Sequence, residues 1–304
     1  MEQKFSLPLE LASALFRFRK GLQKNLQLLF NYYGEFVKNF GFVGMGNMAQ
    51  AIAAGFVAAK KIASENLFAF APNQKKLNDN AKKIGFVPCA SNLELAKKCD
   101  VIFIACKPHQ IEGVLSEIAG ALENKVLVSI AAGWTLATYK NTLGDIFNSV
   151  RIQCVMPNTP SRIGQGVLLF EKENSLGDDE AETLKDLFGA LGLVEILPSS
   201  LMGIGGAISG CGPAFMDLII ESYADAAVKY GIAREQAYRL VSQTMAGSAA
   251  LQLKTGEHPG VLKDAVCSPG GTTIRGVGAL ESAGLRAACI ASIDAVMDFK
   301  KIQS

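Results

Sequence analysis

A short apolar strand, followed at once by a glycine turn and an alanine-rich helix, is the feature that most constrains this chain. Residues 39–43 are mostly apolar, the turn Gly44-Met45-Gly46-Asn47-Met48-Ala49 follows, and residues 49–61, AQAIAAGFVAAKK, form helix readily. In the pattern G-x-G-x-x-A the first glycine permits the turn, the second lets the backbone approach a pyrophosphate, and a small third residue packs helix on strand. The helix N-terminus attracts phosphate. The pattern predicts a dinucleotide site, and the alternative is that the glycines only serve the turn.

The second expected strand, residues 67–71, ends in Pro72-Asn73 without an acidic residue. A dinucleotide with a free ribose 2′-hydroxyl usually meets Asp or Glu at this point. Instead, Lys75 and Lys76 follow Asn73, and these two cations suit a 2′-phosphate. The sequence therefore favours NADPH over NADH, and the alternative is that both lysines are solvated residues at a helix start.

Strands and helices continue to alternate through the first two thirds of the chain. Helices are expected at 74–84, 92–98, 111–121 and 179–191, and strands at 85–88, 101–105, 126–130 and 194–197. This alternation predicts a Rossmann-type, doubly wound parallel sheet, whose ligand crevice lies at the carboxyl ends of the strands. The loops 106–109, 131–133 and 156–160 should line it. Lys107 and His109 are acid–base candidates there, although backbone positioning or simple exposure explains them equally well.

The remaining third predicts helices only. We expect helices at 209–230, 234–254 and, with interruptions, 276–302. Such a domain is too thin for a large core of its own, which suggests completion by a second subunit. Between its helices lies Ser268-Pro269-Gly270-Gly271-Thr272-Thr273. Backbone N–H groups freed by two glycines suit a carboxylate, and the alternative is a plain turn before a helix.

Composition narrows the function classes. The chain has 304 residues, 49% hydrophobic, with a net charge of +2, so no broad basic field points to nucleic acid. Seven cysteines without a C-x-x-C pair, and only two histidines, argue against a disulfide framework and against a metal site. A reducing cytoplasm is the expected location.

Residues 1–37 form a basic amphipathic leader. Leucines and phenylalanines recur at helical spacing with Arg17, Arg19, Lys20 and Lys24 between them, without an apolar run long enough to span a bilayer. We expect an upstream segment that is not part of the native protein; contact with a partner and membrane targeting are the alternatives. The predicted domains are therefore 1–37, a Rossmann domain at 38–198, and a helical dimerisation and substrate domain at 199–304.

Several motifs together resemble the pyrroline-5-carboxylate reductase family. They are GFVGMGNMAQAI, CKPHQI, SIAAG, MPNTP, SGCGPAF and HPGVLKDAVCSPGGTTIRGVGALESAGLR, in order along residues 38–300. The resemblance implies a Rossmann domain joined to an all-helical dimerisation domain, and a homo-oligomer built from dimers. It further implies NAD(P)H-dependent reduction of L-1-pyrroline-5-carboxylate to L-proline, the last step of proline biosynthesis. We expect neither a nucleic-acid nor a membrane partner.

The resemblance also assigns roles to residues. Substrate-binding positions would be Val266, Ser268, Gly270, Gly271, Thr272 and Thr273, with Thr273 closest to the ring nitrogen as the catalytic residue. Cofactor-binding positions would be Gly44, Gly46, Asn47, Met48, Asn73, Lys75, Asn92, Ala105, Lys107, Pro108, Ala131 and Ala132. Two departures from the family pattern are Cys211, where serine is usual, and Ala265, where some members have asparagine.

Two other functions compete with this interpretation. A hydroxyacid dehydrogenase of similar layout would need a lysine or histidine beside the reacting alcohol. Lys229, Lys254, His258 and Lys263 in the helical part have no convincing motif around them. A non-catalytic NADPH-binding sensor is the second alternative, against which the intact S-P-G-G-T-T loop argues.

Overall fold

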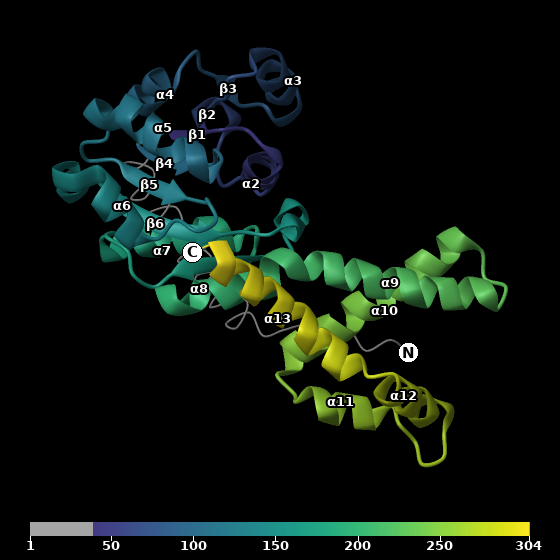
Figure 1. Ribbon diagram of the computed structural model, residues 1–304. Helices are drawn as coiled ribbons and strands as arrows, with labels where there is room; N and C mark the ends of the chain where they lie inside the picture. The colour runs from purple at the N-terminus through teal and green to yellow at the C-terminus, as the bar shows by residue number, and fades with distance from the viewer. Residues whose placement is uncertain (1–38, 304) are drawn as a thin grey trace, which may run out of the picture. The chain divides into compact units, whose positions relative to one another are not determined.

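The computed structural model describes residues 39–303, with the side chains of residues 300–303 left aside; the predicted leader lies outside these residues. The described chain divides into two compact units (Figure 1): one comprises residues 39–157 and 161–196, and the other comprises 158–160 and 197–303. The domain limits expected from the sequence, 1–37, 38–198 and 199–304, stay predictions.

The first unit is built on an eight-stranded sheet. Its strand order is β3-β2-β1-β4-β5-β6-β7-β8. The strands are β1 (Phe40–Val43), β2 (Leu67–Phe70), β3 (Val87–Pro88), β4 (Val101–Ile104), β5 (Val126–Ser129), β6 (Arg151–Met156), β7 (Gly166–Glu171) and β8 (Gly192–Leu197). Neighbouring strands from β3 to β6 run parallel, so the expected doubly wound parallel sheet is confirmed.

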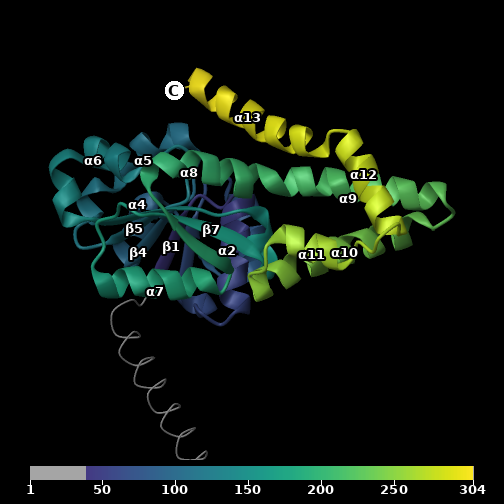
Figure 2. The same cartoon turned by 90° about the horizontal axis from the view of Figure 1, so that it is seen from below.

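Helices cover both faces of the sheet (Figure 2). One apolar cluster joins Phe42 and Phe103 of the strands to α2 (Asn47–Ala58), α3 (Gln74–Ile84) and α7 (Asp178–Gly189). The other joins the opposite strand faces to α4 (Asn92–Lys98), α5 (Ile111–Ile118) and α6 (Leu136–Leu143). Because parallel strands are buried on both faces, β4 and β5 are buried at every position.

Two elements of this unit were not expected. Strand β7 pairs antiparallel with β6, because only a short 3₁₀ connection, Thr159–Ile163, and a turn separate the two strands. Helix α6 follows β5, and its N-cap is Thr135, whose side chain accepts a hydrogen bond from the Thr138 N–H. Both elements matter below, because Glu171 ends β7 and Tyr139 lies on α6.

The second unit is helical, as expected. Its helices are α8 (Ser199–Gly206), α9 (Gly212–Lys229), α10 (Arg234–Thr255), α11 (Pro259–Ala265), α12 (Thr272–Ser282) and α13 (Leu285–Gln303). The first helix begins at Ser199, earlier than the expected residue 209, and joins α9 through a π-helical turn, Ala207–Cys211. Helix α11 was also missed; Pro259 stands in its first turn, where the absent N–H costs little.

Within the described residues, the helical stretch Ser199–Lys229 is long and apolar enough to cross a membrane, judged by length and composition only. Its most apolar window has a mean hydropathy of 1.4 and is 22% buried inside the single chain. A mostly buried core helix of a protein outside the membrane meets the same criteria of length and composition, so one such helix is weak evidence for a membrane span.

Candidate functional site

The glycine turn lies at the carboxyl end of β1, against the loop that follows β4. Parallel register aligns Val43 with Ile104, and Ile104 with Ser129. The Ala105 N–H donates to the Val43 carbonyl at 2.9 Å, and the Gly44 N–H donates to the Phe70 carbonyl at 2.8 Å. The loops after β1, β2, β4 and β5 therefore share one edge of the sheet, the edge at which α/β folds bind ligands.

Gly44 and Gly46 have different physical tasks. Gly44 has φ +93°, and a Cβ there would lie 2.8 Å from the carbonyl carbon of Ala105, so only glycine fits. Gly46 is the N-cap of α2 with φ −75°, and a Cβ on it would have no atom within 4 Å. The turn itself is held by Gln50, whose Nε2 donates to the Met45 carbonyl at 3.0 Å.

The N-terminus of α2 is suited to an anion. Gly46 provides no side-chain cap, and the first turn contains no acidic residue. Its first N–H groups have no partner within the helix, and the helix dipole favours negative charge there. Asn47 is exposed and Met48 is half-buried in this turn, so both predicted residues lie at the open end of the helix.

The residues predicted to contact the adenosine half of the cofactor lie along the same edge of the sheet. Two of them also form hydrogen bonds within the protein. Asn73 caps α3, and its Oδ1 accepts from the Lys76 N–H at 3.0 Å. The side chains of Lys75 and Lys76 are exposed. Asn92 is buried at the start of α4 and donates to Glu117 Oε2 at 2.7 Å, so it also fixes α4 on α5.

The loop after β4 brings Ala105 to the glycine turn. Lys107 is exposed at the N-cap of a short 3₁₀ helix, Pro108–Gln110, in which Pro108 and His109 are also exposed. Burial raises the pKa of the Cys106 thiol above its ordinary value. Among the described residues, no cluster of three or more His, Cys, Asp or Glu side chains forms a metal site.

The loop after β5 carries Ala131 and Ala132, and sequence reasoning missed the residues that hold it. The Tyr139 hydroxyl donates to Ser129 Oγ at 2.9 Å, and Ser129 Oγ accepts from the Ala131 N–H at 3.3 Å. Glu171 Oε2 accepts from the Leu136 N–H at 2.9 Å. The Thr135 cap before L-A-T-Y was the available sequence signal for this helix.

The Ser268–Thr273 loop belongs to the second unit and leads directly into α12. Gly270 has φ +69°, and the Gly271 N–H donates to the Ser268 carbonyl at 3.0 Å. Gly271 is the N-cap of α12 and offers no side-chain cap. The amides of Thr272 and Thr273, in the first helical turn, are therefore available to another acceptor. Val266 is exposed at the end of α11.

Asn158–Pro160 of the M-P-N-T-P loop and the two departures from the family pattern also lie in the second unit. Asn158 of the M-P-N-T-P loop is buried and donates through Nδ2 to the Ser209 carbonyl at 2.9 Å. Ser209 lies in the π-helical turn, which ends at Cys211, the first departure from the family pattern. Ala265, the second departure, is the exposed last residue of α11.

Fold and site define a class: an oxidoreductase with a Rossmann-type nucleotide-binding unit and a helical unit. Two family models match, described as NADP oxidoreductase, coenzyme F420-dependent, over residues 39–133, and as pyrroline-5-carboxylate reductase dimerisation over residues 199–301. The pyrroline-5-carboxylate reductase of Treponema pallidum is 42% identical over 260 residues, covering 85% of this chain and 98% of its own. The chain belongs to the pyrroline-5-carboxylate reductase family, which confirms the resemblance read from its motifs.

Further relatives support the same family membership. The Escherichia coli reductase is 37% identical over 262 residues, covering 86% of this chain and 96% of its own. The solved structure of the Plasmodium falciparum enzyme with NADP bound is similar with a TM-score of 0.77 and 34% identity, over 87% of this chain and 97% of that one. The Coxiella burnetii enzyme gives 0.79 and 31%, over 88% and 98%.

Proposed function

We propose that this chain reduces L-1-pyrroline-5-carboxylate to L-proline, with NADPH as the preferred hydride donor and NADH as the alternative. The observation that carries the proposal is family membership across almost the whole described chain, at 42% identity to the Treponema pallidum reductase. The glycine turn and the Ser268–Thr273 loop supply the two binding functions that this reaction needs.

The residues present fit a nicotinamide dinucleotide. The space in front of Gly46 and the uncapped N-terminus of α2 accept a pyrophosphate, and Asn47 and Met48 flank it. Asn73 and Lys75 would meet the adenosine ribose or its phosphate, with Lys76 adjacent. Asn92, Ala105, Lys107, Pro108, Ala131 and Ala132 would line the rest of the channel. A bound nicotinamide supplies the hydride, which no protein side chain provides.

The substrate loop holds the carboxylate. Because the Gly271 N–H is used in the turn itself, we assign the carboxylate to the amides of Thr272 and Thr273, at the positive end of α12. Gly270 and Gly271 shape the turn. A Cβ on Gly271 would lie 2.4 Å from Ser268 Oγ, so no larger residue fits without moving Ser268. Val266 and Ser268 complete the surroundings of the ring.

The chemistry needs alignment more than a strong acid. A protonated cyclic imine is already electrophilic, so the chain has to hold its reacting carbon toward the hydride donor. The Thr273 hydroxyl hydrogen-bonds the ring nitrogen and orients it. Addition of the hydride converts the iminium to a secondary amine, which takes a further proton from water because it is more basic than the imine.

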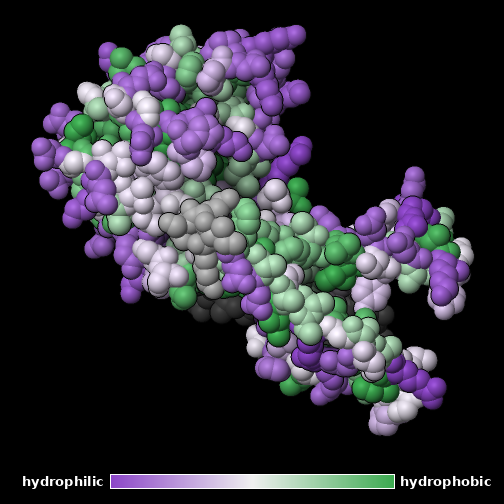
Figure 3. Space-filling model, in the orientation of Figure 1, coloured by the Kyte–Doolittle hydropathy of each residue, from purple (hydrophilic) through white to green (hydrophobic). Residues whose placement is uncertain are grey.

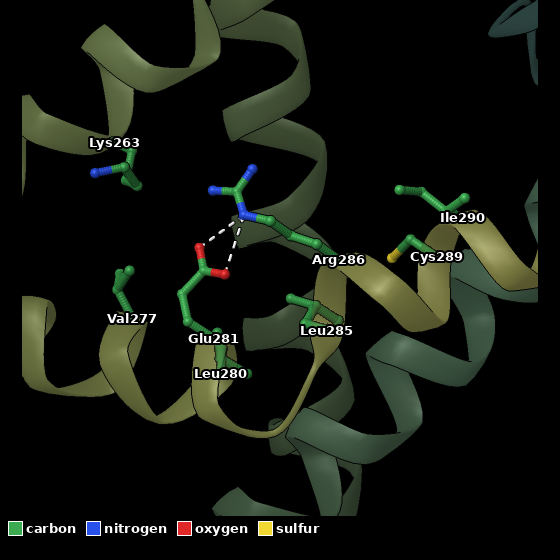
Figure 4. Close-up of a pocket in the computed structure, with 8 residues that line it drawn as sticks. All are labelled: Lys263, Val277, Leu280, Glu281, Leu285, Arg286, Cys289 and Ile290. Carbon is green, nitrogen blue, oxygen red and sulfur yellow. Dashed lines mark hydrogen bonds and ion pairs between the residues drawn. The ribbon is translucent and has the colours of Figure 1, made fainter.

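The helical unit forms a homodimer, from which larger oligomers are built. Exposed apolar residues lie along α9 and α13 (Figure 3), including Leu218 and Ile290. A pocket of about 540 Å³ between α11, α12 and α13 is lined mainly by apolar side chains, and the Glu281–Arg286 ion pair is among its lining residues (Figure 4). A second copy of the chain covers these surfaces and the apolar stretch Ser199–Lys229. The protein acts in the cytoplasm, and neither lipid nor nucleic acid is its partner.

A turnover assay separates this function from the alternatives. The purified chain is incubated with NADPH or NADH and either pyrroline-5-carboxylate or a set of 2-keto acids, and loss of the reduced nicotinamide absorbance is followed. Turnover with the imine and none with the keto acids supports the proposal. Turnover with keto acids favours a hydroxyacid dehydrogenase, and calorimetric NADPH binding without turnover of any imine favours a sensor.

A further inference from the structure

The loop between β5 and α6 is fixed at both of its ends by buried side chains. At its start, Ser129 Oγ accepts from the Ala131 N–H at 3.3 Å. At its end, Thr135 caps α6, and Glu171, which is 2% exposed, accepts from the Leu136 N–H at 2.9 Å. Ala132 and Gly133 between these ends are exposed. The loop is therefore a short exposed segment held by a rigid frame.

Tyr139 connects the frame to the body of the unit. Its side chain is completely buried, and its hydroxyl donates to Ser129 Oγ at 2.9 Å. A phenylalanine would fill the same apolar space, whereas a buried hydroxyl is costly unless it is bonded. Burial holds the pKa of the Tyr139 phenol well above its ordinary value, so the hydroxyl keeps the proton that it donates. Tyr139 is thus linked to the Ala131 backbone through two hydrogen bonds that share Ser129 Oγ.

We propose that Tyr139 is a positioning residue for the nicotinamide end of the bound dinucleotide, acting through Ser129 on the backbone of Ala131. The proposal rests on the proposed function, in which Ala131 and Ala132 line the nicotinamide part of the channel. Tyr139 itself lies beneath the loop and touches neither cofactor nor substrate. Its hydroxyl fixes the position of the loop between β5 and α6, while its ring packs in the core.

The chain carries its own reporter for this loop. Trp134, the single tryptophan of the sequence, lies at the end of the loop, with its ring centroid 4.8 Å from that of Tyr139. Energy transfer from Trp134 to a reduced nicotinamide depends on their separation and orientation. It is measured on the full chain without any imine substrate.

Two ligands separate the nicotinamide end from the adenosine end. NADPH occupies the whole channel, whereas adenosine 2′,5′-bisphosphate carries only the adenosine half. In Tyr139→Phe, the Kd of NADPH should rise about two- to tenfold, the range that one hydrogen bond accounts for, with weaker energy transfer from Trp134. The Kd of adenosine 2′,5′-bisphosphate should stay at the wild-type value, which a general loss of structure would not allow.

Ser129→Ala is the second variant, since it removes the acceptor of both the Tyr139 hydroxyl and the Ala131 N–H. It should weaken NADPH binding at least as much as Tyr139→Phe does, and the double variant should be no worse than Ser129→Ala alone, because Tyr139 acts only through Ser129. Thr142→Val is the matched control: it removes a hydroxyl that bonds only the Thr138 carbonyl on the same helix, and it should bind both ligands as wild type does.

The outcomes are separable. Equal weakening of both ligands, unchanged NADPH binding, or additive effects of the two substitutions would each overturn the role of Tyr139. A wild-type chain that binds NADPH but does not reduce the imine overturns the proposed function and leaves the binding comparison, and the role of Tyr139, standing.

Discussion

Gly44 and Ala105 approach so closely that a single Cβ on Gly44 would lie 2.8 Å from the Ala105 carbonyl carbon. The glycine turn and the loop after β4 are therefore one packed unit, and the nearby Gly46 faces open space. We therefore expect stability to depend on the first glycine, and the proposed function assigns cofactor binding to the second.

Substitution of these two glycines should separate folding from cofactor binding. Gly44→Ala combines a positive φ with a backbone clash, and should lower the free energy of unfolding by about 1–3 kcal/mol, measured in urea. Gly46→Ala should unfold as wild type does but bind NADPH at least about tenfold more weakly by calorimetry, because its methyl group occupies the phosphate approach. Gly113→Ala on α5, also in open space, is the control and should leave NADPH binding unchanged. Wild-type NADPH affinity in Gly46→Ala would contradict the assigned pyrophosphate site.

The lysines after Asn73 should set the preference between the two cofactors. Loss of one charge-assisted phosphate contact in Lys75→Ala should raise the KM for NADPH by about tenfold and leave the KM for NADH unchanged. Lys76→Ala tests the neighbouring residue in the same assay. Lys82→Ala, an exposed lysine at the other end of α3, should change neither value. Equal effects on both cofactors would show that these lysines do not read the 2′-phosphate.

Thr273 should affect turnover and not cofactor affinity. In Thr273→Ala the ring nitrogen loses its orienting hydroxyl, so kcat should fall by about ten- to a hundredfold. The Kd of NADPH, measured by calorimetry, should stay at the wild-type value. Thr273→Ser, which keeps the hydroxyl, should restore most of the turnover. An unchanged kcat in Thr273→Ala would remove this residue from the mechanism.

A charge in the apolar pocket of the helical unit should dissociate the oligomer. Ile290 is 64% exposed in the single chain, so Ile290→Glu should fold, while burial of its carboxylate against a second copy is unfavourable. Light scattering should give a smaller molar mass than for the wild type. Ile163→Glu, at a residue 76% exposed in the first unit, should keep the wild-type mass. A dimer that persists in Ile290→Glu would mean that this pocket is not covered by the second copy.

The free energy of unfolding should fall at alkaline pH, and ionisation of the Cys99 thiol should account for part of this fall. Burial raises the pKa of the Cys99 thiol from 9.0 to about 12. The unfolded chain therefore loses this proton first, and the contribution of Cys99 is full below pH 9 and lost as the pH rises toward 12. Urea unfolding of Cys99→Ala should show a shallower decline over this range. Leu95→Ala, which creates a cavity in the same apolar cluster, should lower the free energy of unfolding at every pH and leave its slope against pH unchanged. Identical slopes in Cys99→Ala and the wild type would contradict the role of this thiol.

Local signals made the Rossmann-type unit predictable. The strand, the glycine turn and the helix around Gly44 adjoin in the chain, so their pattern is visible in one short window. Likewise, the Gly270-Gly271 pair marks its turn directly. Alternation of apolar strands with helices then indicated the parallel sheet, because each such unit requires a crossover helix.

Relations between distant residues could not be predicted in the same way. Glu171 is a buried carboxylate whose partner, the Leu136 N–H, is 35 residues away. Helix α6 has only eight residues, several of them poor helix formers, and its stability depends on packing and on the Thr135 cap. The π-helical turn before α9 has no sequence signature comparable to a glycine turn, and it became visible only in the structure.

Transfer of a labelled hydride tests the central claim most directly. NADPH carrying deuterium at the transferable nicotinamide position is incubated with the chain and pyrroline-5-carboxylate, and the product is analysed by mass spectrometry and chiral chromatography. The proposed function predicts L-proline with one deuterium on the former imine carbon, formed one-for-one with NADP⁺. Proline without the label, or oxidation of NADPH without proline, would contradict it.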